Sequence, residues 1–88
     1  MISPKAYLRS LKNVRKGLET RTKIVDALGR KQLPVGEISR LTGVSARRVR
    51  YHLRNMQHDG VVVRKRVGKR FYWMMTGAGQ ASLDEALA

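Results

Sequence analysis

The chain has 88 residues, of which 19 are lysine or arginine and 6 are aspartate or glutamate, so its formal net charge is +13. A chain of this length forms one small domain. Repulsion among so many positive charges destabilises the compact state unless a polyanion binds. Nucleic acid is the favoured partner, ahead of an anionic membrane. The sequence contains no cysteine, which excludes a disulfide framework, a thiolate nucleophile and a cysteine metal site.

The N-terminal part of the chain predicts two helices that are separated at a glycine. From Pro4 to Lys16, apolar residues recur at helical spacing and form a stripe of Tyr7, Leu8, Leu11 and Val14. Gly17 is expected to interrupt this helix. A second helix is predicted from Leu18 to Leu28, where Gly29 acts as its C-terminal stop, and its inward residues are Ile24, Ala27 and Leu28.

A helix-turn-helix pattern follows a short extended link at Leu33-Pro34. Its first helix is predicted from Glu37 to Thr42, with Ile38 and Leu41 buried. Gly43 suits the tight turn because glycine takes positive φ without a Cβ clash, and Ser45 can cap the next helix. That second helix runs from Ala46 to Asp59, is stopped by Gly60, and has a core stripe of Val49, Leu53 and Met56.

The exposed positions of the second helix carry the residues that we expect to contact DNA: Ser45, Arg47, Arg48, Arg50, Tyr51 and Arg54. A merely solvated helix face mixes charges, whereas this one has no acid before Asp59. Arginine reads guanine in the major groove by a bidentate contact, and Arg48 is expected to hold phosphate instead. Two alternatives stay open: Tyr51 contacts a sugar or thymine methyl or fills a half-buried position, and Ser45 caps the helix alone or also donates to phosphate.

A basic β-hairpin is predicted next, with strands from Val61 to Arg66 and from Arg70 to Met75, and a turn at Val67-Gly68-Lys69. Its cations exceed what solubility or protection of an edge strand requires, so we place them on the DNA backbone or in the minor groove: Arg64, Lys65, Arg66, Lys69 and Arg70. The returning strand is apolar on both faces, which predicts that something covers the second face.

A short helix from Ala78 to Leu87 is predicted to end the chain, with an apolar stripe at Leu83 and Leu87. This stripe and the N-terminal one have little core left to cover them in so short a chain. We therefore expect a homodimer whose interface contains Tyr7, Leu8, Leu11, Val14, Trp73, Leu83 and Leu87. The alternative is a monomer in which the two terminal helices pack together.

The order of these elements resembles a winged helix-turn-helix protein and is most similar to the ArsR-like repressors. Residues Thr20 to Leu28 resemble the family's first core helix, Val44 to Leu53 the recognition helix, and Gly60 to Tyr72 the wing. The expected fold is therefore mostly α with a small β-hairpin (α+β). In one domain, residues 1–17 are an N-terminal helix, 18–60 the helical core, 61–75 the wing and 76–88 a C-terminal helix.

The resemblance implies DNA binding, usually as a homodimer joined by terminal helices, but it does not extend to metal sensing. The family's metal sensors place cysteines in the first helix of the helix-turn-helix, and residues 33–38 contain none here. His52 and His58 are also not four apart, the spacing that brings two side chains together on one helix face. His52 lies beside the core stripe, so we expect it to be structural.

These features together predict a sequence-specific transcription regulator that binds double-stranded DNA as a homodimer. Two alternatives stay open: a weakly specific DNA-compacting protein and a winged helix that binds structured RNA. We expect no catalytic residue, cofactor or metal, because the acids are scattered and none pairs with histidine. The run from Phe71 to Met75 is too short to span a membrane, and residues 1–16 contain no secretion signal, so a cytoplasmic, nucleoid-associated protein is expected.

Overall fold

One long helix, rather than two, begins the chain. The computed structural model describes residues 4–80, with side chains from Arg15 onward. Helix α1 spans Pro4–Leu28, so the prediction that Gly17 interrupts it is wrong. A Cβ at Gly17 would meet only His52 Cε1, at 3.9 Å. The cost of a glycine inside a helix is only about 1 kcal/mol, which the packing of the flanking turns can offset.

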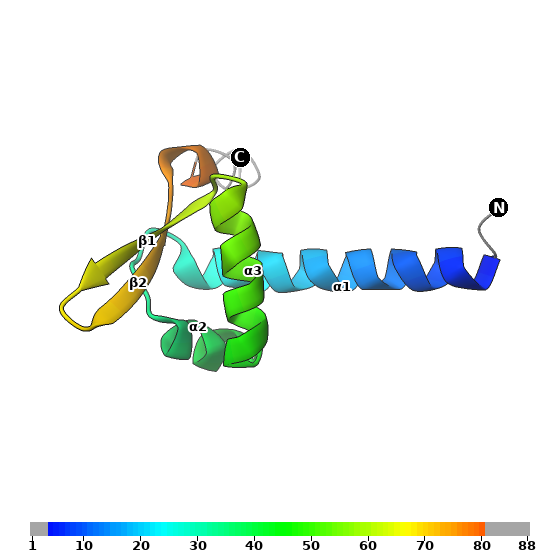
Figure 1. Ribbon diagram of the computed structural model, residues 1–88, viewed down its shortest axis with the longest axis horizontal. Coiled ribbons are helices and arrows are strands. Elements are labelled where there is room, and N and C mark those ends of the chain that lie inside the picture. The colour runs from blue at the N-terminus through cyan, green and yellow to red at the C-terminus, as the bar shows by residue number, and fades with distance from the viewer. Residues whose placement is uncertain (1–3, 81–88) are drawn as a thin grey trace.

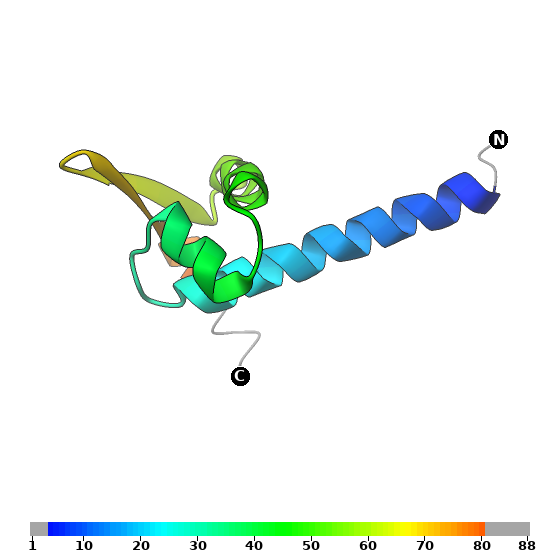
Figure 2. The same cartoon turned by 90° about the horizontal axis from the view of Figure 1, so that it is seen from below.

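The other elements gather around the C-terminal half of α1. They are α2 (Val35–Thr42), α3 (Ala46–His58), β1 (Val62–Val67) and β2 (Arg70–Met75). Figure 1 shows α3 crossing α1, with α2 and the hairpin on the side away from the N-terminus. Both views show the N-terminal half of α1 extending away from every other element (Figure 2), so the molecule measures 50 × 31 × 22 Å.

The two strands form an antiparallel hairpin whose register runs from Val62 opposite Met75 to Val67 opposite Arg70. The turn is therefore Gly68-Lys69, one residue shorter than predicted, and Gly68 supplies its positive φ of 62°. The predicted extended link also pairs with the hairpin: Leu33 N–H donates to Trp73 O at 3.0 Å, and Trp73 N–H donates to Leu33 O at 2.8 Å. This bridge fixes the base of the hairpin to the connection between α1 and α2.

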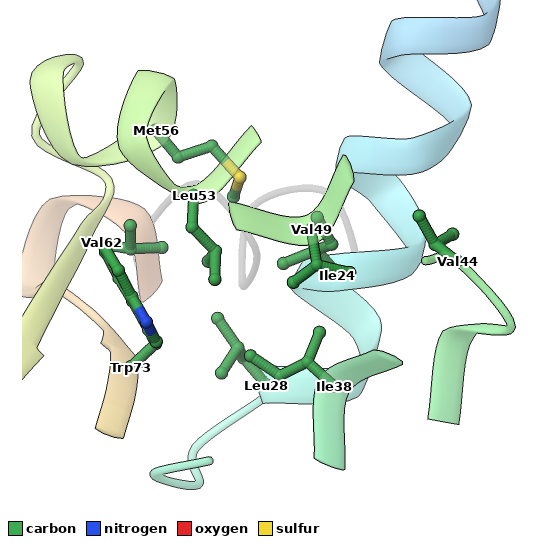
Figure 3. Close-up of a cluster of buried hydrophobic side chains, with 9 residues drawn as sticks. All are labelled: Ile24, Leu28, Ile38, Val44, Val49, Leu53, Met56, Val62 and Trp73. Carbon is green, nitrogen blue, oxygen red and sulfur yellow. The ribbon is translucent and has the colours of Figure 1, made fainter. Parts of the chain in front are cut away.

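Side chains from all five elements meet in one core (Figure 3). The predicted stripe on α3 is confirmed, since Val49 and Leu53 are 0% exposed and Met56 is 2% exposed. Each side chain of this size contributes about 1.5–3 kcal/mol when it is fully buried. The rest of the core is Ile24, Leu28, Ile38, Val44, Val62 and Trp73.

Two predictions about burial are wrong. Leu41, expected in the core, is 49% exposed, because it lies three residues after the buried Ile38 and so is rotated by roughly 60° away from it on the helix. Trp73, assigned to a dimer interface, is 4% exposed and packs in the core of its own chain. Phe71, nearer the hairpin tip, lies beyond the reach of the core and is 42% exposed.

The predicted C-terminal helix is only partly covered by the described residues, of which 77–80 are helical. Leu83 and Leu87 lie outside the described residues. The side chains of Tyr7, Leu8, Leu11 and Val14 are likewise outside the described part, although their backbone belongs to α1. The dimer interface expected at these positions therefore stays a prediction.

Candidate nucleic-acid interface

Helix α3 turns its basic face to solvent because its other face is held in the core. Arg47, Arg48, Arg50 and Arg54 are all exposed, and Tyr51 is 63% exposed. Tyr51 is therefore not a half-buried filler, and its contact with a sugar or thymine methyl stays a prediction. A shallow depression of about 350 Å³ lies over this face and is lined by Arg47, Arg50, Tyr51, Arg54 and Asn55.

Asn55 is the one residue of this depression that the sequence analysis did not include. It follows Tyr51 by four residues and Arg54 by one, so helical spacing alone would have placed it at the edge of the basic face. Its amide offers both a donor and an acceptor, the combination that pairs with the edge of adenine. It therefore joins the candidate DNA-contacting residues.

The start of α3 is fixed by hydrogen bonds from the turn that precedes it. Ser45 Oγ accepts from Arg48 N–H at 3.3 Å, which confirms the predicted cap. Gly43 closes α2 with a φ of 71°, as the turn requires. Ser39 Oγ then donates to Val44 O at 2.6 Å, so the turn is tied back to α2. This bracing sets the direction in which the first basic residues of α3 point.

The hairpin cations fall into two groups. Arg64 lies over Phe71, with its Cζ 4.2 Å from the ring centroid, and 5.9 Å from that of Trp73. Arg66 Nε donates to Gly68 O at 3.0 Å, which ties this guanidinium to the turn. Lys65 and Lys69 have exposed side chains and none of these contacts within the described part of the chain. Arg70 is also exposed, so these three are free to reach phosphate.

No acidic side chain lines the depression over the basic face of α3. Glu37 accepts hydrogen bonds from Arg40 on α2, and this contact lowers the pKa of the Glu37 carboxyl. Asp59 pairs with Arg21 of α1 at 3.2 Å, at the C-terminal end of α3. The positive potential of the face is therefore not cancelled by a neighbouring carboxylate in the described structure.

His52 is buried, as expected of a structural residue, but its ring is not fully satisfied. The residue is 8% exposed, and the described structure provides no hydrogen-bond partner for its buried Nδ1. Burial lowers the pKa of His52, and the positive charges of Arg21 and Arg48 lower it further. Within residues 4–80, no three His, Asp or Glu side chains are grouped to hold a metal ion.

Comparisons with known proteins identify the family and the fold of this chain. The family model described as "Bacterial regulatory protein, arsR family" matches residues 19–63. A homodimeric winged helix-turn-helix DNA-binding domain from Mycobacterium bovis is 27% identical, with a TM-score of 0.69 over 99% of this chain and 83% of that one. No curated protein matches the sequence.

Two further solved structures share the fold. A predicted DNA-binding transcriptional regulator from E. coli is 22% identical over 97% of each chain, with a TM-score of 0.69. NolR from Sinorhizobium fredii is 19% identical over 99% of this chain and 91% of that one, with a TM-score of 0.67. Within the described residues, no helix is both long enough and apolar enough to cross a membrane.

Proposed function

Because this chain belongs to the ArsR family of bacterial regulatory proteins, it is a winged helix-turn-helix DNA-binding transcription regulator and not an enzyme. We propose that it reads duplex DNA sequence-specifically as a homodimer, with α3 in the major groove. The observation that carries this proposal is the acid-free basic face of α3, which lies opposite the core stripe of the same helix. We infer that the protein acts at the nucleoid in the cytoplasm.

The residues of α3 divide by role. Arg47 and Arg50 border the depression over the helix and are assigned to base edges, where a guanidinium can make two parallel hydrogen bonds. Arg48 and Ser45 lie at the first turn and are assigned to phosphate, because backbone contacts fix the register of a protein on the duplex. Arg54 completes the basic face one turn after Arg50.

The hairpin is the wing and contacts the DNA backbone or the minor groove through Lys65, Lys69 and Arg70. Arg64 and Arg66 contribute positive charge as well, but their guanidinium groups are also held by Phe71 and the turn. The wing therefore combines exposed lysines, whose flexible stems suit phosphate, with arginines that also contact the hairpin itself.

A homodimer is supported by the half of α1 that extends beyond the rest of the chain (Figure 1). The apolar stripe of Tyr7, Leu8, Leu11 and Val14 falls on this half. The related domain from Mycobacterium bovis is itself described as homodimeric. Pairing through α1, with Leu83 and Leu87 alongside, would place two recognition helices about 34 Å apart, one turn of DNA.

Selection of bound sequences from a random duplex pool tests the specific reading. We expect enrichment of a two-fold symmetric site, and Arg50→Ala should relax the preference at one position of each half-site at a cost of about 1–3 kcal/mol. Lys23→Ala, an exposed lysine on α1, is the matched control and should retain the preference. If Arg47→Ala and Arg50→Ala weaken specific and random duplexes equally, the protein coats DNA without reading it, as the net charge of +13 would favour.

Sedimentation tests the dimer. The chain should sediment as a dimer at micromolar concentration, and Leu11→Asp should shift it towards the 10.0 kDa monomer. A 10.0 kDa species that Leu11→Asp leaves unchanged would contradict the proposed assembly.

A further inference from the structure

We propose that the groove between α1 and α3 binds a small phosphate-bearing anion. This groove has a volume of about 630 Å³, and all of its lining residues belong to α1 or α3. Its basic lining comes from two elements, Lys16 and Arg21 on α1 and Arg47 and Arg48 on α3. Pockets of 300–1,000 Å³ are the usual size of small-molecule sites.

The charge in this groove is not neutralised by the chain. None of its lining residues is acidic. Within the described residues, Lys16, Arg47 and Arg48 have no ion pair, and Arg21 pairs with the half-exposed Asp59, which does not line the groove. Four cations that converge from two helices repel one another, and an anion between them would remove that repulsion.

His52 provides the second, independent observation. Its ring lines the groove, more than nine-tenths of the residue is buried, and its Nδ1 has no hydrogen-bond partner in the described structure. A buried polar atom without a partner is uncommon and costs free energy. The positive charge of a protonated His52 ring would add to the attraction that the arginines exert on a phosphate group in the groove.

The same groups couple binding to pH. The charged or titratable groups that line the groove together with His52 are Lys16 and Arg21 from α1, and Arg47, Arg48 and Tyr51 from α3. Four of the five are cations, so they disfavour a charged ring. An anion in the groove would offset them and raise the pKa of His52, which burial, Arg21 and Arg48 lower in the free protein. By linkage, the anion should bind more tightly as the pH falls towards that pKa.

The rim of the groove is apolar, which narrows the class of ligand. Leu18 is 59% exposed and Tyr51 is 63% exposed, and both line the groove. A phosphate monoester with an aromatic or apolar substituent would place its anion among the cations and its substituent on these side chains. Phenyl phosphate is therefore the preferred probe, and inorganic phosphate measures the contribution of the anion alone.

Occupancy of the groove would also oppose DNA binding, a consequence that rests on the proposed function. Arg47, Tyr51 and Asn55 line both this groove and the depression over the basic face of α3. A ligand that holds Arg47 removes it from the duplex, so the groove would act as an effector site. Its binding chemistry does not depend on DNA and can be measured without it.

The test is a titration of the full chain with phenyl phosphate in the absence of DNA, followed by calorimetry and by the NMR signals of His52. We expect saturable binding, weaker binding of inorganic phosphate, and an increase in the pKa of His52 on saturation. Arg21→Gln should weaken binding by about tenfold, the effect of one charge-assisted hydrogen bond. Lys16→Gln should also weaken it, and Lys23→Gln, whose side chain does not line the groove, is the matched control.

Three outcomes separate the possibilities. If phenyl phosphate does not saturate, or if Arg21→Gln and Lys16→Gln bind it as Lys23→Gln does, the proposal is overturned. If no small anion binds but Arg21→Gln weakens duplex DNA binding, the groove holds a backbone phosphate of DNA, which also overturns the small-molecule site. If phenyl phosphate binds as expected but the protein binds no DNA, the site stands and the proposed function fails.

Discussion

Gly79 lies directly against the carbonyl group of Val61, and a Cβ at position 79 would overlap that carbonyl. Thr76 also binds this segment: its N–H donates to Val61 O at 3.0 Å, and its Oγ1 donates to Gly60 O at 2.7 Å. The chain after β2 is thereby fixed to the connection between α3 and β1.

Gly79→Ala should lower the free energy of unfolding by about 1–3 kcal/mol, because the backbone of residues 76–80 must move away from Val61. Gly77→Ala is the matched control, since a Cβ there meets nothing within 4 Å. Chemical denaturation of the two variants checks the prediction, which would be wrong if both retained the wild-type stability.

Gly17→Ala should raise the free energy of unfolding by up to about 1 kcal/mol, the difference between alanine and glycine inside a helix. The added methyl group meets His52 Cε1 only at an ordinary contact distance of 3.9 Å. The same denaturation experiment measures it. A destabilised Gly17→Ala protein would show that α1 does not continue through this position.

Arg64→Ala should destabilise the protein by about 0.5–1 kcal/mol, the value of an exposed cation–π contact, whereas Lys65→Ala should leave its stability unchanged. For DNA binding we expect the lysine, rather than the arginine, to show the clearer effect. Lys65→Ala should weaken all duplexes similarly and reduce the salt slope by about one unit. Thermal unfolding and binding at several salt concentrations measure the pair, and equal effects of the two variants on stability would contradict the assignment.

Acid should destabilise the folded chain through His52. Its pKa is lowered from 6.5 in the folded state, so the unfolded chain binds the proton more readily. The contribution of the neutral ring is complete above pH 6.5 and is lost as the pH falls through that value towards the lower, folded pKa. Urea denaturation across this range should show a decline that His52→Gln reduces. The control is His58→Gln, on the exposed surface of α3, which should keep the wild-type decline.

DNA affinity should depend steeply on salt. If about five cations of α3 and the wing contact phosphate in each protomer, log K should fall with log salt by about 4–5 per protomer. Binding isotherms at several salt concentrations provide the slope. A slope shallower than about −2 for the whole dimer would mean that most of the positive charge is not used on DNA.

The buried face of α3 was predictable because the helical period of its apolar residues defines a single stripe. Val49, Leu53 and Met56 occupy one stripe, and the arginines can only lie opposite. The exposure of Leu41 was not predictable. In a helix of only eight residues, the side chains that are buried depend on how α2 lies against its neighbours. The face of β2 that enters the core was undetermined for a different reason, because both of its faces are apolar.

The break assigned to Gly17 failed because a local preference was outweighed by contacts distant in the sequence. The groove between α1 and α3 was hidden from the sequence for a related reason. Lys16 and Arg48 come together only because two helices cross, and nothing in the spacing along the chain encodes that crossing. The sequence therefore predicted the face that a single helix exposes, but not the groove that two helices form together.

Because α1 is unbroken, a small tilt of this helix at the core is magnified at its N-terminal end. At a rise of 1.5 Å per residue, the half of α1 beyond the core is roughly 20 Å long, so a tilt of about 10° at the core moves its free end by about 3–4 Å. In a dimer joined at that end, the same tilt in each protomer would alter the separation of the two recognition helices. In such a dimer, the stiffness of one helix would set the distance between the half-sites that the protein accepts, and a ligand bound against the base of that helix would change this distance.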